Sequence, residues 1–190
     1  MIALLSGALR DAATEEALAA ELRDLDPGLS KSAARALAEV LAPFLRTLPD
    51  ALAWAVAAAR DPHGGRALAF ATGSVLHYVV DDDDLVPEST APLVGLVDDA
   101  YLTHAYVAAV HRAFPGLTTP LGYEPPEQRA FDVAAALLPA GVAESLIRTC
   151  TSSTEIARAL FAGGSQDAGI DDARVQLDLR PAEAAAQLAG

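Results

Sequence analysis

One stretch of the chain decides the fold. Residues 65–113 read GRALAFATGSVLHYVVDDDDLVPESTAPLVGLVDDAYLTHAYVAAVHRA. Its first part repeats apolar residues every three or four positions, the spacing of one helix face, and predicts a helix over about 65–80. That face consists of Leu68, Thr72, Val75, Leu76 and Val79. Pro92 suits the first turn of a helix, so we expect a second, longer helix that reaches Phe114. The two helices should form a hairpin around an acidic, proline-containing turn.

The segments before this hairpin also carry helical patterns. Thr14 is placed to cap a helix, and the Asp26-Pro27-Gly28 sequence should end it. The expected apolar face of this helix consists of Leu18, Leu22 and Leu25. A second apolar series contains Pro43, which predicts a kink or a break at that position. Pro49 suits the first turn of a third helix.

After the hairpin, a stretch rich in Gly, Pro and Thr predicts an irregular surface connection. The helical pattern resumes at about Gln128. Ser152 and Glu155 match the S/T-x-x-E capping box, which predicts a helix from about Ser153 to Phe161.

These patterns predict an all-α protein, and a length of 190 residues suits one domain. We expect a single-domain helical bundle of about seven helices over residues 1–162. A flexible link and an extended C-terminal arm should occupy residues 163–190. In the arm, Val175, Leu177 and Leu179 alternate with polar residues as in a strand. The arm either packs on the helices or stays partly ordered, and strand addition between chains is the alternative.

The net charge of -13, from 26 acidic and 13 basic residues, repels phosphate backbones and anionic lipid head groups. We therefore expect no nucleic-acid partner. The charge-free apolar stretch at residues 67–80 is shorter than the ~20 residues that a membrane-spanning helix needs. We accordingly expect a buried core helix there and no stable membrane insertion.

Cys150 is the only cysteine, which excludes an intramolecular disulfide and a zinc site of several thiolates. We expect it to be a small buried residue. The N-terminus shows no basic leader and only a short apolar run, so no secretory signal is expected. These features favour a cytoplasmic location.

Negative charge is concentrated in the hairpin. Residues 81–99 contain seven acidic residues and no basic one, which is more than half of the net charge. They are Asp81, Asp82, Asp83, Asp84, Glu88, Asp98 and Asp99.

This hairpin resembles the YkvA-like bacterial domain of unknown function over about residues 68–107. The family shows Tyr, then Pro-x-Asp-Leu-Ile-Pro-Asp, a second Pro, Gly and a closing Asp-Asp. The matching positions are Tyr78, Asp84, Pro87, Pro92, Gly95, Asp98 and Asp99. The resemblance implies a helical hairpin with a proline-rich turn, and the family brings no established activity.

The chain also departs from the family pattern. Asp82 stands where the family has proline, and Glu88 replaces its aspartate. The spacer from Ser89 to Ala91 is one residue longer than usual. The chain therefore looks like a divergent relative.

Clustered carboxylates suggest a metal site, because Mg²⁺, Mn²⁺ and Ca²⁺ prefer oxygen ligands. A shared cation would offset the mutual repulsion of the candidate ligands, which are Asp84, Glu88, Asp98 and Asp99. The alternative, which we favour, is a solvated acidic turn whose aspartates cap helices.

The histidines do not join this cluster on a single helix. His104 and His111 lie seven residues apart on one face of the second hairpin helix. At ~100° per residue, that face excludes Asp98 and Asp99. His77 could add a ligand from another helix, but a hydrogen-bonded core or boundary histidine is the favoured interpretation.

No complete catalytic signature is present. The sequence lacks Glu-x-x-His, His-Glu-x-x-His, Gly-Lys-Ser/Thr and Gly-x-Ser-x-Gly. We therefore predict a non-enzymatic helical interaction or regulatory module, whose acidic hairpin docks a protein with a basic surface. The predicted docking residues are Asp81, Asp82, Asp83 and Tyr78.

Two other functions stay open at this point. One is a divalent-metal-dependent hydrolase that uses the carboxylate cluster to activate water. The other is a peripheral membrane protein, although the charge pattern opposes it. A homo-oligomer is compatible with the alanine-rich helices.

Overall fold

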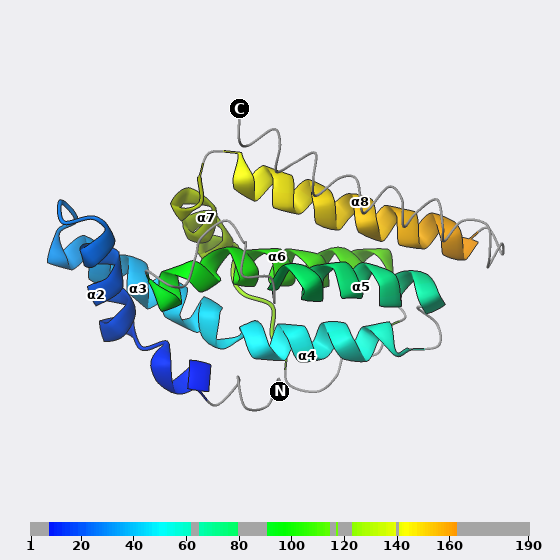
Figure 1. The fold of residues 1–190 in the computed structure, drawn as a ribbon, viewed down its shortest axis with the longest axis horizontal. Helices are drawn as coiled ribbons and strands as arrows, with labels where there is room; N and C mark the ends of the chain where they lie inside the picture. The colour runs from blue at the N-terminus through cyan, green and yellow to red at the C-terminus, as the bar shows by residue number, and fades with distance from the viewer. Residues whose placement is uncertain are drawn as a thin grey trace.

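The computed structural model describes residues 8–61, 65–79, 91–114, 117, 123–139 and 141–162. Within these ranges the chain forms helices and no strand, which confirms the all-α prediction (Figure 1). A helical segment at residues 8–12 comes first. The labelled helices are α2 (Glu15–Leu25), α3 (Lys31–Arg46), α4 (Leu48–Ala59), α5 (Gly65–Val79), α6 (Pro92–Ala113), α7 (Gln128–Leu137) and α8 (Val142–Ala162). The predicted link and C-terminal arm lie outside the described residues.

Helix α2 begins at the predicted cap. The side chain of Thr14 accepts a hydrogen bond from the backbone N–H of Ala17 at 3.1 Å. Leu18 and Leu22 are buried as predicted, but Leu25 is 50% exposed. Leu25 is the last residue of α2, so the apolar face ends one turn before the helix does.

The break between α3 and α4 lies at Thr47, not at Pro43 as predicted. Helix α3 continues through Pro43, which is exposed, and ends at Arg46. On the solvent side, water can bond the carbonyl that lost its N–H partner to the proline. Pro49 then removes the N–H that would bond the carbonyl of Leu45, and the helix is interrupted there.

Helix α6 is the centre of the bundle. It is the longest labelled helix, packs against all the others and buries most of its residues (Figure 1). Tyr78 bonds to Asp98, and Thr72 bonds to Tyr106. Because these pairs run in opposite order along the two helices, α5 and α6 are antiparallel. The predicted helical hairpin is confirmed for its two helices.

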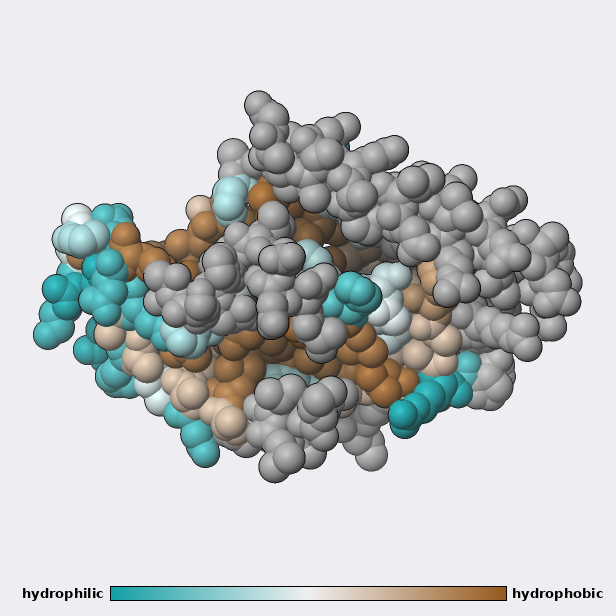
Figure 2. Space-filling view, in the orientation of Figure 1, coloured by the Kyte–Doolittle hydropathy of each residue, from teal (hydrophilic) through white to brown (hydrophobic). Residues whose placement is uncertain are grey.

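The core is built from leucine, valine and many alanines, which allow the helix axes to approach closely. Its largest fully buried side chains are Trp54, Tyr106 and Phe44. In Figure 2, hydrophilic residues cover the end of the molecule formed by α2, and hydrophobic residues gather in the middle.

The capping box at Ser152 does not start a helix. Helix α8 begins at Val142, directly after Gly141, and runs through Ser152 without a break. In the interior of a helix each backbone N–H already bonds a carbonyl one turn earlier. Near Ser152 there are therefore no unpaired N–H groups for a side chain to cap. Gly141 has φ 83°, a conformation that glycine adopts without strain.

One described segment, Lys31–Ala59, is long and apolar enough to cross a membrane by length and composition. It comprises α3 and α4, and more than half of its most apolar window is buried inside the bundle. The core helices of soluble proteins meet the same criterion.

Candidate functional site

Buried polar groups are concentrated on α6. Among the described residues, the buried polar or charged side chains are Thr72, Asp98, Asp99, Thr103 and His104. All but Thr72 belong to α6. Asp98 and Asp99 are both 0% exposed, so the interpretation of these two carboxylates as part of a solvated turn is wrong.

Asp98 links α6 to the end of α5. Tyr78 donates a hydrogen bond from its hydroxyl to Oδ2 of Asp98 at 3.0 Å, and the backbone N–H of Asp99 donates to Oδ1 at 3.1 Å. Hydrogen bonds to a buried carboxylate replace the water that it loses. Tyr78 itself is half-buried. Its hydroxyl therefore makes an internal contact, and its role as a docking residue stays a prediction.

A carboxylate from α2 caps the start of α6. Oε2 of Glu21 accepts hydrogen bonds from the backbone N–H groups of Leu93 at 2.9 Å and Val94 at 3.1 Å. Ala91, at the N-cap position, makes no side-chain cap. A negative charge at a helix N-terminus is also favoured by the helix dipole. The sequence around Leu93 gives no signal for Glu21, because a cap that lies 72 residues away leaves no local pattern.

The structure brings together only some of the predicted site residues. Tyr78 and Asp98 are in contact, and Asp99 is adjacent. The other five acidic residues, Asp81, Asp82, Asp83, Asp84 and Glu88, lie outside the described residues. Within the described ranges, no three His, Cys, Asp or Glu side chains are grouped so that they could hold a metal ion.

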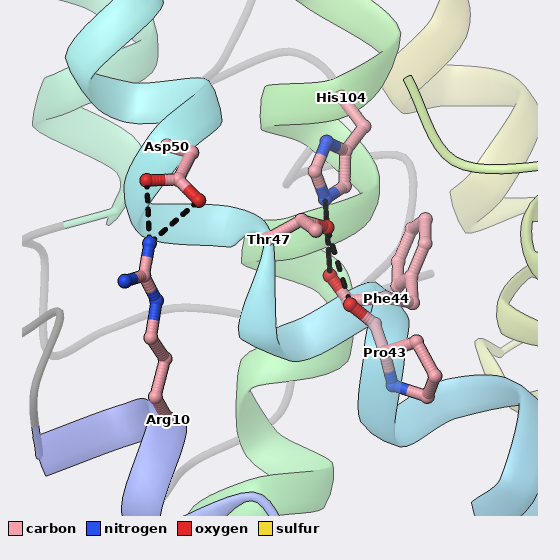
Figure 3. Close-up of polar contacts among 6 residues, drawn as sticks. All are labelled: Arg10, Pro43, Phe44, Thr47, Asp50 and His104. Atoms are coloured by element: carbon pink, nitrogen blue, oxygen red, sulfur yellow. Dashed lines mark hydrogen bonds and ion pairs between the residues drawn. The ribbon is translucent and has the colours of Figure 1, made fainter. Parts of the chain in front are cut away.

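His104 is the centre of a second polar cluster (Figure 3). Its Nε2 atom lies 3.1 Å from the carbonyl oxygen of Phe44 and 3.3 Å from Oγ1 of Thr47. Its Nδ1 atom lies 3.0 Å from the hydroxyl of Tyr123. Because a carbonyl can only accept, Nε2 carries the hydrogen and Nδ1 accepts from Tyr123. Burial lowers the pKa of His104 to about 4, with the Phe44 hydrogen bond opposing it, so the ring is neutral.

The break at Thr47 explains why Phe44 needs this partner. The last carbonyls of an α-helix have no N–H group one turn ahead. The Phe44 carbonyl accepts instead from His104 Nε2 and from the Thr47 hydroxyl, which is 2.9 Å away. His104 therefore completes the C-terminus of α3 and is a hydrogen-bonded core residue.

Two more histidines, His77 and His111, lie in the part of the chain that the structure describes. His77 is exposed on α5. His111 is exposed on the last turn of α6, and its ring stacks on Trp54 with centroids 5.4 Å apart and an interplanar angle of 17°.

Cys150 is buried, as predicted, and its Sγ atom donates to the carbonyl of Leu102 at 3.6 Å. Burial raises the pKa of the thiol to about 12, which keeps it protonated and unreactive. Burial likewise raises the pKa of Tyr106, whose hydroxyl lies 2.8 Å from Oγ1 of Thr72. These groups hold the core together.

No known protein family, curated protein or solved structure matches the chain. The resemblance to the YkvA-like domain stays a prediction that depends on the residues of the hairpin.

Proposed function

We infer that this protein is a helical interaction module whose docking surface is the acidic segment at residues 81–88. This segment carries five carboxylates and no basic residue. Opposite charge accelerates and orients the encounter of two proteins, so the partner would be a protein with a basic surface. A cytoplasmic location belongs to the same proposal.

The observation that supports this proposal is the anchoring of both flanking helices. At the end of α5, Tyr78 bonds to Asp98, which is buried in α6. At the start of α6, Leu93 and Val94 bond to Glu21 of α2. The acidic segment therefore joins two helix ends that are fixed to the core, and fixed ends reduce the entropy that a docking segment loses on binding.

A basic synthetic peptide provides a defined probe of the docking surface. We expect the variant Asp81→Asn, Asp82→Asn, Asp83→Asn, Asp84→Asn to bind it about tenfold more weakly or worse in calorimetric titration, since ~1.4 kcal/mol corresponds to a factor of ten. The matched control removes the same charge from exposed carboxylates elsewhere and consists of Asp11→Asn, Asp24→Asn, Glu124→Gln and Glu144→Gln. Equal weakening by both variants would show that only net charge matters, and the proposal would be abandoned.

A divalent-metal-dependent hydrolase is the second candidate. Two adjacent buried carboxylates, Asp98 and Asp99, favour it, because a nearby cation would lower the cost of burying their charge. Titration of the intact protein with Mg²⁺, Mn²⁺ or Ca²⁺ tests it. Binding accompanied by a rise in melting temperature, lost in Asp98→Asn, would favour the metal site over the docking surface.

A further inference from the structure

His104 connects three parts of the chain that are distant in sequence. Its own helix is α6, its Nε2 atom bonds to Phe44 at the end of α3, and its Nδ1 atom accepts from Tyr123 in the segment 123–127. The ring also stacks on Tyr123 with centroids 5.9 Å apart and an interplanar angle of 18°. The segment 123–127 has no regular secondary structure and leads directly into α7. The His104 ring is therefore a junction between the segment and the bundle.

The surroundings of the ring favour its neutral form. Phe44 lies 4.7 Å from it and Phe131 of α7 lies 6.3 Å from it, measured between ring centroids. Among the described residues, Tyr123 is the titratable side chain that forms a hydrogen bond and a ring contact with it. The charged residues that follow or precede these contacts in the sequence are Arg46 on α3, Asp50 on α4, Glu124 and Glu127 in the segment, and Arg129 and Asp132 on α7. None of these forms a hydrogen bond or an ion pair with His104 in the described structure.

We propose that His104 is an acid-sensitive latch, which holds residues 123–127 against α3 and α6 while it is neutral and releases them when it is protonated. A proton on Nδ1 removes the acceptor that Tyr123 uses. The Tyr123 hydroxyl can turn to accept, but the positive charge then lies among aromatic rings, and no carboxylate of the described residues is bonded to it. Release of the segment admits water to the ring and hydrates that charge.

The direction of the pH effect follows from the two states of the latch. In the released state the ring is hydrated and titrates near the ordinary value of 6.5, whereas burial lowers its pKa to about 4 in the closed state. Above pH 6.5 the ring is neutral in both states, so the free-energy difference that favours the closed state is at its maximum. Between pH 6.5 and 4 the ratio of released to closed molecules rises about tenfold per pH unit.

Hydrogen exchange of the full-length protein, corrected for the intrinsic effect of pH, tests this proposal. The expected result is exchange of the Tyr123, Glu124 and Glu127 amides that rises about tenfold per pH unit from pH 6.5 to 4, while amides in the middle of α6 change less. His104→Gln keeps an amide that can donate and accept but cannot titrate, so it should flatten this dependence. His111→Gln, at the exposed histidine, should leave the dependence unchanged.

Several outcomes would overturn the latch. They are a pH dependence that His104→Gln leaves intact, equal acceleration of the segment and α6, and an NMR titration that gives His104 its ordinary pKa. If His104→Gln fails to fold, Tyr123→Phe replaces it, because Phe keeps the ring stack and deletes the hydroxyl. That variant should exchange faster in the segment at neutral pH and retain the pH slope, and an unchanged rate at neutral pH would also count against the latch.

Discussion

The hydroxyl of Tyr78 donates to the buried carboxylate of Asp98 at 3.0 Å and so fixes the end of α5 to the second turn of α6. Asp98 is 0% exposed, whereas an acidic residue in a turn is ordinarily exposed to solvent. A carboxylate in the core requires hydrogen-bond donors around it. Without them, the loss of water from the charged group costs roughly several kcal/mol. The pair therefore belongs to the architecture of the hairpin as well as to the candidate site.

Replacing Tyr78 by phenylalanine tests this pair. We expect Tyr78→Phe to lower the free energy of unfolding by about 1–3 kcal/mol, because it removes a donor from a buried carboxylate and keeps the ring. Urea denaturation measures the effect. In the Asp98→Asn background the same substitution should cost less, since the acceptor is then uncharged. Equal costs in both backgrounds would exclude a role for the charge.

The Glu21 cap gives a second prediction. Glu21→Gln keeps one acceptor oxygen and loses the charge, so we expect a loss of about 0.3–1 kcal/mol in unfolding free energy at low salt. Salt should shrink this loss, because ions screen partly exposed charges. Asp24→Asn is the control, since Asp24 is exposed on the same helix and makes no cap. A loss at Glu21 no larger than at Asp24 would contradict the capping role.

The bond between Thr72 and Tyr106 gives a third prediction. Thr72→Val leaves the buried Tyr106 hydroxyl without its partner and should cost about 1–3 kcal/mol. The double variant Thr72→Val, Tyr106→Phe removes both polar groups and should be less destabilised than the sum of the single variants. Thermal and urea unfolding of the wild type, the two single variants and the double variant complete the double-mutant cycle. Strictly additive losses would show that the hydrogen bond contributes nothing to stability.

The raised pKa of Cys150 gives a fourth prediction. Its folded value of about 12 lies above the ordinary 9.0, so the unfolded chain loses the proton first as pH rises. The contribution of Cys150 to the free energy of unfolding is therefore constant below pH 9. It falls between pH 9 and 12, by up to ~1.4 kcal/mol per pH unit. Cys150→Ala should reduce the slope of stability against pH in that range.

Thiol labelling provides an independent measurement of the same property. At pH 8 the native Cys150 should react with a disulfide reagent only through opening of the bundle, so denaturant should accelerate labelling strongly. Rapid labelling of the native protein would contradict both its burial and its raised pKa.

The sequence by itself determined the positions of most helices. Thr14 starts α2, Pro92 starts α6, and Gln128 starts α7 at the residues that local patterns predict. Caps and proline positions act through the residues within one turn, so they can be recognised in a single chain. The helix start that the capping box at Ser152 predicts is wrong, because the same residues are compatible with the interior of a longer helix.

Tertiary structure alone decided which polar side chains are buried and what they contact. Helix α6 is apolar around most of its circumference, which is the sequence signal for a central helix and could have suggested that Asp98 and Asp99 are buried. Glu21 and the Phe44 carbonyl, in contrast, reach α6 only because the bundle packs α2 and α3 against it. Burial and hydrogen-bond partners depend on contacts between helices, and no pattern confined to one turn specifies them.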